Sequence, residues 1–360
     1  MDTASTRTSR RDAIDVARCL ALFVVVFGHL AMAVVDRPGG AVRGANLLAL
    51  RPNWAWVAVA APMPVFFAAA GWANATTTFT SAATRLRTLV GLAAVVVAVW
   101  SAAVVVASFV VGGPGAVGSG ARVATQPLWF LAAYLPLAAA AGPIARLAAR
   151  RPIVAIGGCL GLLAVLDVIR FGYDGPAAIG WAGFLVAWSV PWLAGAAWRA
   201  RSERGAFAER RVGLALLAGF GAVGALLVAF GEYQVSLIDA VPGGRSNTSP
   251  PTLYTAVVGM AQVGALMLAA RALDRLGRRA RRLFDAIGEA SVGIYVWHLT
   301  ALSLCVCLIA VGAPTPERLT ATWWLTRPVW FAIVLGLAAA LVLSTATVRQ
   351  YRRARPVRSS

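Results

Sequence analysis

Residues 88–111, TLVGLAAVVVAVWSAAVVVASFVV, run for two dozen positions without a single charged side chain. An α-helix rises about 1.5 Å per residue, so this stretch is long enough to cross a hydrocarbon core about 30 Å thick. No water is present in that core to pair with backbone groups, which favours a helix because its hydrogen bonds are internal. The stretch therefore predicts a transmembrane helix.

Similar apolar runs recur along the whole chain. Hydrophobic residues make up 59% of the sequence and charged residues only 13%, with a mean hydropathy of +0.74. A soluble chain is nearer half apolar and one quarter charged. We therefore expect an all-α integral membrane protein, a polytopic bundle of about ten transmembrane helices. The predicted spans lie near 14–35, 54–73, 88–111, 127–149, 152–170, 178–198, 212–232, 252–270, 290–312 and 328–348.

The basic residues support this topology. The net charge is +19, and all 33 basic residues are arginines. With the N-terminus inside, 24 arginines fall in inner segments and eight in outer segments, while Arg18 lies in the first span. The positive-inside rule then predicts that both termini are cytoplasmic, in a multi-pass protein of the cell (plasma or inner) membrane. Because these charges sit in short loops, we attribute them to topology and to anionic membrane lipids, and expect no nucleic acid partner.

The chain reads as a single transmembrane domain over residues 1–360, with a short cytoplasmic N-terminal segment 1–13 and a basic C-terminal tail 349–360. The longest linkers, around 36–53, 112–126, 233–251 and 313–327, are rich in Gly, Pro and Ser and are expected to form turns and short loops. A cleavable signal peptide is the alternative for the first span. The charged and polar side chains of Asp15, Arg18 and His29 argue against it, since a signal core is apolar.

Ionisable residues inside the spans are the first candidates for function, because they are costly in a bilayer. The sequence has only two histidines, His29 and His298, and both fall in predicted spans. Arg18 and His29 differ by about 20° around a helix and by about 16.5 Å along it, so they share one face. Asp15, three residues before Arg18, can pair with it. The competing account of Arg18 is an arginine that snorkels to the headgroups.

No metal site is predicted from the four cysteines. Cys19, Cys159, Cys305 and Cys307 all lie in apolar runs, and none has the spacing of a metal-ligand cluster. They are expected to be buried free thiols.

Four segments together resemble one family. RDAIDVARCLALFVVVFGHL (11–30) is similar to the opening helix of the acyltransferase-3 family, whose motif is an arginine, ten residues and a histidine. MPVFF (63–67) followed by Gly71 resembles the second helix, and LWFL (128–131) resembles a Trp-Phe-Leu element. GEASVGIYVWH (288–298) resembles a late helix with Ser, Ile-Tyr and His. The four segments occur in the family's order.

This resemblance implies a ten-helix membrane-bound O-acyltransferase. Such enzymes move an acyl group, often acetyl from acetyl-CoA, to a hydroxyl of a glycan or another extracytoplasmic acceptor. The resemblance implies that Arg18 helps to hold acyl-CoA and that His29 serves the transfer, either as a base or as a group that takes the acyl covalently. No bound cofactor is expected, because acyl-CoA is a substrate.

The cytoplasmic loop after the second span departs from the family pattern. The family has two arginines three positions apart, whereas Arg85 and Arg87 are two apart here. Their role in donor binding competes with a purely topogenic role.

Further candidates for a supporting role are Ser291, Tyr295 and His298, which share one helix face, and Trp129. His298 fits a structural hydrogen bond between helices as well as it fits catalysis, and Trp129 fits an interfacial anchor.

The alternative function is a transporter or exporter of a small molecule or glycan. Pro136 and Pro191 interrupt spans, as prolines do in transporters, but no matching halves are visible. The sequence does not fix the acceptor, the acyl chain length or the oligomeric state.

Overall fold

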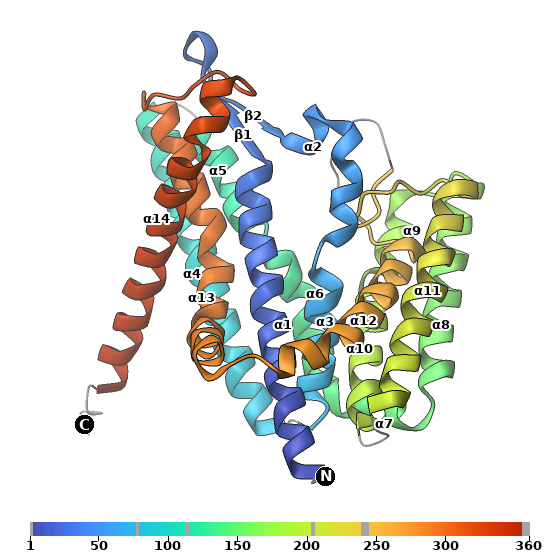
Figure 1. Ribbon diagram of the computed structural model, residues 1–360. Coiled ribbons are helices and arrows are strands. Elements are labelled where there is room, and N and C mark those ends of the chain that lie inside the picture. Colours follow the sequence, from blue (N-terminus) through green and yellow to red (C-terminus); the bar gives the residue numbers. More distant parts are fainter. Residues whose placement is uncertain (1–2, 77–78, 112–114, 203–205, 239–244, 355–360) are drawn as a thin grey trace. The chain divides into compact units, whose positions relative to one another are not determined.

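The computed structural model describes residues 3–76, 79–111, 115–202, 206–238 and 245–354 (Figure 1). Within these ranges most residues belong to helices, and the strands form one two-stranded sheet. The predicted all-α architecture is confirmed.

The elements follow one another in this order: α1 (Thr3–Met32), β1 (Ala33–Asp36), η1 (Pro38–Gly40), β2 (Arg43–Asn46), α2 (Leu47–Leu50), η2 (Pro52–Ala60), α3 (Met63–Asn74), α4 (Phe79–Val111), α5 (Gly115–Thr125), α6 (Leu128–Ala139), α7 (Ala141–Arg150), α8 (Pro152–Asp167), η3 (Val168–Gly172), α9 (Ala177–Ala182), α10 (Phe184–Ala200), α11 (Ala206–Phe230), α12 (Leu253–Asp274), α13 (Arg278–Ala310) and α14 (Ala321–Ala354).

The number of membrane-spanning helices agrees with the sequence. Among the described residues, nine helical segments are long and apolar enough to cross a membrane. A tenth span results if Gly115–Ala139 and Ala141–Arg150, which meet at a bend of 69°, are counted together. Each of the ten predicted spans overlaps one of these segments, so the prediction of about ten spans is confirmed.

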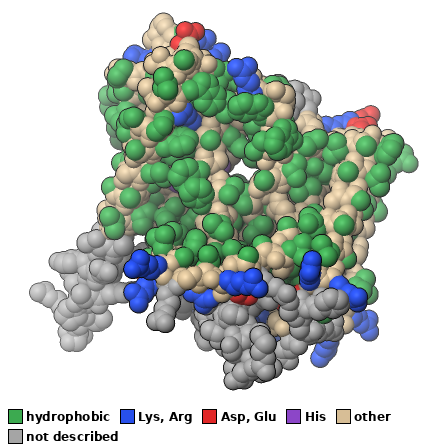
Figure 2. Space-filling model, in the orientation of Figure 1, with side chains coloured by type: hydrophobic (Ala, Val, Ile, Leu, Met, Phe, Trp, Pro, Cys, Tyr) green, Lys and Arg blue, Asp and Glu red, His purple; other side chains and the backbone are tan. Residues whose placement is uncertain are grey.

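Large hydrophobic side chains are exposed along these helices, as expected for contact with lipid. Phe109 is 87% exposed, Phe230 86% and Ile153 85%. Figure 2 shows hydrophobic side chains over most of the visible face. A soluble protein rarely exposes contiguous apolar patches of more than a few hundred Å². This exposed apolar surface is therefore expected to contact lipid rather than water.

Three predicted linkers are partly helical, so these predictions were wrong in part: 36–53 contains α2, 112–126 contains α5, and 313–327 contains the start of α14. Residues 115–125, expected to form a loop because of their glycines, form α5. The side chain of Ser303 donates a hydrogen bond to the carbonyl oxygen of Gly120 at 2.9 Å, and a Cβ at Gly120 would lie 3.2 Å from the Trp100 ring. Here a small residue permits close helix packing, which overrides the low helix propensity of glycine.

The last helix also begins earlier than expected. The linker 313–327 was predicted to continue up to Pro328, but α14 already begins at Ala321 and contains Pro328. A proline inside a helix removes one backbone hydrogen bond, a loss that membrane helices tolerate where neighbouring groups compensate.

Backbone contacts divide the chain into two compact units. Unit 1 contains residues 1–25, 48–86 and 132–288, and unit 2 contains residues 26–47, 87–131 and 289–360.

In unit 1, α3 and α10 approach each other closely at two glycines. A Cβ at Gly71 of α3 would collide with the backbone of Trp192, and a Cβ at Gly195 of α10 would collide with the backbone of Ala68. Small residues of this kind let helix backbones touch in membranes, where packing rather than water exclusion holds helices together. Glycine is thus required at both positions.

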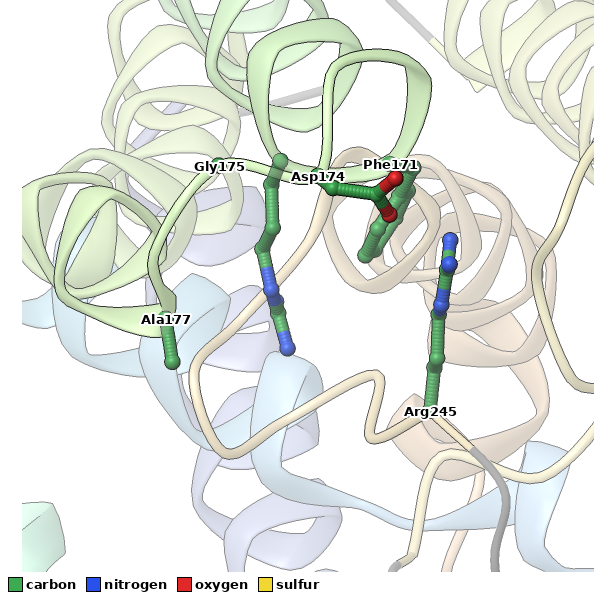
Figure 3. A pocket seen from close by; sticks show the side chains of 6 residues that line it. Phe171, Asp174, Gly175, Ala177 and Arg245 are labelled. Carbon is green, nitrogen blue, oxygen red and sulfur yellow. The ribbon is translucent and has the colours of Figure 1, made fainter.

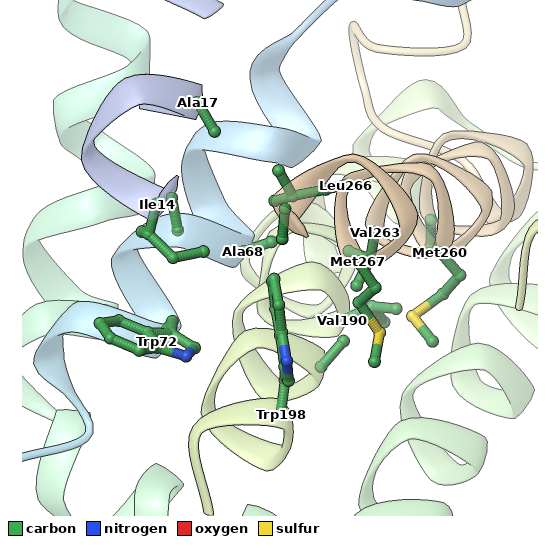
Figure 4. Packing of buried hydrophobic residues seen from close by; sticks show 14 of the residues in the cluster. Ile14, Ala17, Ala68, Trp72, Val190, Trp198, Met260, Val263, Leu266 and Met267 are labelled. Carbon is green, nitrogen blue, oxygen red and sulfur yellow. The ribbon is translucent and has the colours of Figure 1, made fainter. Parts of the chain in front are cut away.

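The core of unit 1 forms around this helix pair (Figure 4). Trp72 lies in it near Ile14 of α1, and Trp198 lies near aliphatic and methionine side chains of α12, including Val263 and Met267. The carboxylate of Asp167 accepts a hydrogen bond from the backbone N–H of Leu253, at 2.7 Å, at the start of α12. A carboxylate at this end of a helix stabilises the unpaired N–H groups there.

In unit 2, α13 is held by side chains of α4 and by the backbone of α5. The indole N–H of Trp100 donates to the hydroxyl of Thr300 at 3.3 Å, and Val296 and Trp297 pack with Leu92 and Val96. The strands β1 and β2, which directly follow α1, pair antiparallel with Ala33 opposite Asn46. These contacts join α13 to α4, and β1 to β2.

Candidate active site

The two histidines of the chain lie side by side in unit 2. Nε2 of His298 is 3.1 Å from Nδ1 of His29, and the ring centroids are 5.1 Å apart. His29 is half-buried near the end of α1, whereas His298 of α13 is fully buried. Residues 269 positions apart are thus joined by one hydrogen bond, within segments long and apolar enough to span a membrane.

Tyr295 forms the next layer around this pair. Its backbone carbonyl lies 2.7 Å from Nδ1 of His298, and its hydroxyl donates to the carbonyl oxygen of Pro127 at 3.1 Å. The ring of Phe130 packs against the Tyr295 ring, with centroids 5.2 Å apart. Trp129, a candidate from the LWFL segment, lies edge-on to Phe130, with ring centroids 6.4 Å apart. The structure therefore brings Tyr295 to the histidine pair, and Phe130 to Tyr295.

Sequence reasoning missed Arg327, which it assigned to an outer loop. Arg327 lies in α14 and donates hydrogen bonds to the backbone carbonyls of Leu30 and Ala31, directly after His29. Its guanidinium carbon is 4.4 Å from the centroid of the Trp323 ring and 5.1 Å from that of Phe331. Aromatic residues at i−4 and i+4 from an arginine are a cation–π signal that the sequence contained.

Arg18, in unit 1, pairs with Asp15 as their spacing suggested. The guanidinium donates to the Asp15 carboxylate at 3.1 Å, and both side chains are about two-fifths exposed, Arg18 42% and Asp15 44%. On the same helix, the thiol of Cys19 donates to the carbonyl oxygen of Phe284. Because α1 is continuous from Thr3 to Met32, a single helix carries both Arg18 and His29.

The remaining predicted residues are less informative. Arg87 is exposed on α4, and the side chain of Arg85 lies outside the described part of the chain. Ser291 is half-buried on α13, one turn before Tyr295.

A second charged cluster lies just after α1. Asp36 of β1 is 2% exposed, with its carboxylate 3.5 Å from Nε of Arg43 and 3.8 Å from Nε of Arg318. Burying a carboxylate is costly unless opposite charges are near. Two arginines that the sequence count treated as topogenic therefore also neutralise a buried acid.

Unit 1 contains a separate cavity of about 190 Å³ (Figure 3). The guanidinium carbons of Arg170 and Arg245 both lie 4.9 Å from the centroid of the Phe171 ring. Asp174 also lines the cavity, and Arg245 forms an ion pair with Glu232. With charges of both signs and none of the predicted site residues, the cavity does not indicate one ligand.

Tyr233, outside the spans, contributes a hydrogen-bond donor near this cavity. Its hydroxyl donates to the Asp167 carboxylate at 3.0 Å. Burial raises the pKa of Tyr233, and the neighbouring Asp167 carboxylate raises it further. The hydroxyl therefore remains protonated and continues to donate.

Within the described residues, no group of three or more His, Cys, Asp or Glu side chains is arranged to hold a metal ion. The four cysteines are free thiols, and Cys19 and Cys305 are buried.

Comparison with protein families gives a match over nearly the whole chain. The acyltransferase-3 family model, described as an acyltransferase domain, matches residues 11–349. Comparisons with curated proteins and with solved structures gave no match. The matched range includes the histidine pair, Arg18 and Arg327, and it favours an acyltransferase over the alternative of a transporter. The chain belongs to the acyltransferase-3 family.

Proposed function

We propose that this acyltransferase moves an acyl group, acetyl in the first instance, from cytoplasmic acyl-CoA to a hydroxyl of a glycan or another extracytoplasmic acceptor. The observation that carries the proposal is the hydrogen-bonded pair of His29 and His298 in membrane-spanning helices. Histidine is the side chain best suited to take and return a proton near neutral pH.

Donor binding is assigned to Arg18. The phosphates of CoA are anionic, and the planar guanidinium of arginine matches the geometry of phosphate oxygens. The side chain is 42% exposed, which leaves it accessible to a phosphate. Its guanidinium lies 3.1 Å from the carboxylate of Asp15, which orients it. His29 is about 16.5 Å further along the same helix, a distance that an extended pantetheine arm can cover. Any donor role of Arg85 and Arg87 rests on the family resemblance.

The reaction is a transfer from sulfur to oxygen. His29 takes the proton of the acceptor hydroxyl while the oxygen attacks the thioester carbonyl. The carbon–sulfur bond then breaks, and the CoA thiolate takes the proton from His29, giving an ester and free CoA. A route in which His29 first takes the acyl group covalently gives the same products.

In the proposed topology the protein lies in the plasma or inner membrane of the cell, and both of its termini lie in the cytoplasm. The support is the distribution of arginines, 24 on the inner side against eight on the outer side. In this orientation, Arg18 lies toward the cytoplasmic end of α1 and His29 toward the outer end.

The test is acyl transfer by the purified, detergent-solubilised protein. Acetyl-CoA and longer acyl-CoAs are offered with a panel of hydroxyl-bearing acceptors, and free CoA and the ester product are measured together. We expect acceptor-dependent CoA release that equals ester formation. A monodisperse protein that releases no CoA with any donor and acceptor, in detergent and in vesicles, would count against the proposal.

A further inference from the structure

The hydrogen bonds around the histidine pair have a fixed direction. The backbone carbonyl of Tyr295 can only accept a hydrogen bond, and it lies 2.7 Å from Nδ1 of His298. Nδ1 of His298 must therefore carry a proton. In an uncharged imidazole only one nitrogen is protonated, so Nε2 of His298 is then an acceptor.

The same reasoning extends to His29. Its Nδ1 lies 3.1 Å from Nε2 of His298, which accepts in the uncharged pair. Nδ1 of His29 must therefore donate, and Nε2 of His29 is left as the nitrogen without a proton. This nitrogen is the basic one.

We propose that His298 is a positioning residue that fixes the tautomer of His29, so that Nε2 of His29 takes the proton of the acceptor hydroxyl. The inference rests on the proposed function and names the nitrogen that acts. When the hydroxyl oxygen bonds to the acyl carbon and the carbon–sulfur bond breaks, Nε2 of His29 gains one proton and then returns it to the thiolate of CoA. His298 accepts the same hydrogen bond throughout, and this bond becomes stronger while His29 is charged.

The surroundings make His298 suited to this role. It is fully buried, so water does not compete for its nitrogens. Its helix is held by the hydrogen bond from the Tyr295 hydroxyl to the carbonyl oxygen of Pro127. A group that orients a catalytic histidine is effective when its own position is fixed by packing.

The first measurement is independent of activity. Since the chain has only two histidines, labelling with ¹⁵N-histidine gives the signals of these two rings alone. Above about pH 8, where imidazole in water is neutral, we expect both rings to be protonated at Nδ1 and unprotonated at Nε2. A His29 ring protonated at Nε2 in the neutral wild-type protein would overturn the inference, even in a sample without any measurable turnover.

The second measurement uses two variants at one position. His298→Leu removes the acceptor, and we expect turnover to fall by about 10²–10⁴-fold, the scale on which a lost tautomer-fixing partner or a lost base acts. In His298→Gln the side-chain amide oxygen can accept from Nδ1 of His29. We expect this variant to retain the Nδ1-protonated His29 signal and to recover at least about one tenth of wild-type turnover.

The matched control is Thr300→Val, two residues further along α13. This change also removes a buried hydrogen bond between helices, the one from Trp100, but it does not touch His29. We expect Thr300→Val to retain wild-type turnover. If it loses as much as His298→Leu, or if His298→Gln is as inactive as His298→Leu while His29 keeps its tautomer, then His298 does not act by fixing that tautomer. If His29→Ala retains full turnover, the proposed function of His29 fails instead.

Discussion

Arg327 of α14 donates a hydrogen bond to the carbonyl oxygen of Ala31, at 3.2 Å, two residues after His29. The last carbonyl groups of a helix have no partners within the helix, and a cation near them is also favoured by the helix dipole. Arg327 thereby completes the end of α1 at the turn that carries His29. Phe27 and Phe331, with ring centroids 5.9 Å apart, join the same two helices.

Replacing Arg327 should therefore destabilise the protein. Arg327→Leu leaves the carbonyls of Leu30 and Ala31 without their donor, and we expect a loss of about 1.5–3 kcal/mol, the scale for hydrogen bonds to charged groups. Thermal unfolding in detergent measures this as a lower Tm. The exposed Arg51 provides the control variant Arg51→Leu, which should leave Tm unchanged. Equal Tm values for the two variants would refute the role of Arg327.

The catalytic role of His29 predicts a loss of turnover without a loss of donor binding. His29→Ala should lower turnover by about 10²–10⁴-fold, the usual contribution of general acid–base catalysis. Acyl-CoA affinity should stay near wild type, because Arg18 is a separate contact three helical turns away. The control is Leu20→Ala, a change at a 43% exposed position of the same helix. Wild-type turnover in a well-folded His29→Ala protein would remove His29 from the mechanism.

Replacing Arg18 should change the affinity for acyl-CoA. Arg18→Ala should weaken acyl-CoA binding by about 10-fold or more, since a hydrogen bond to a charged group contributes about 1.5–3 kcal/mol. Arg18→Lys should recover only part of this loss, because an ammonium cannot make the bidentate contact. Arg87→Ala, measured in parallel by equilibrium binding, distinguishes a donor ligand from a topogenic charge. Unchanged affinity in both Arg18 variants would reduce Arg18 to a snorkelling residue.

The glycine contacts predict which positions do not tolerate a side chain. Gly195→Val would force a side chain into the backbone of Ala68, and overpacking of this kind costs about 1–3 kcal/mol or more. Gly219→Val is the control, because nothing lies within 4 Å of a Cβ built there. Thermal unfolding should show a clear loss of stability for Gly195→Val alone. Similar stability of both variants would contradict the close approach of α3 and α10.

The topology is tested with reporter fusions. A reporter placed after Ser360 or near Arg204 should be active only if it functions in the cytoplasm, as the arginine distribution predicts. Enzymatic activity of a periplasmic reporter at either position would exclude a ten-helix arrangement with both termini inside.

The spans could be predicted from the sequence because lipid solvation acts on each helix separately. The run 88–111 is apolar enough to identify α4 without knowledge of any neighbour. By contrast, α5 was missed because its helical state depends on contacts with distant residues, such as the hydrogen bond from Ser303 to Gly120. Glycine in a short segment signals a turn unless a packing partner is known.

The residues of the candidate site could be predicted from the sequence, but their contacts could not. Periodicity placed Arg18 and His29 on one helix, and the rarity of histidine in membranes marked His298 as the second candidate. The direct contact between His29 and His298 could not be derived, since no local pattern relates residues 269 positions apart. Arg327 was assigned to a loop because the predicted span began at residue 328, and its actual partners are backbone carbonyls of another helix.

The two glycine contacts between α3 and α10 also restrict motion. The two backbones are in contact at two positions along the helices. A shift of α3 by one residue would bring Ala70 or Trp72 to the position where only Gly71 fits. Neither sliding nor rotation of one helix against the other is therefore open to this pair. Any motion that displaces α3 therefore has to displace α10 with it.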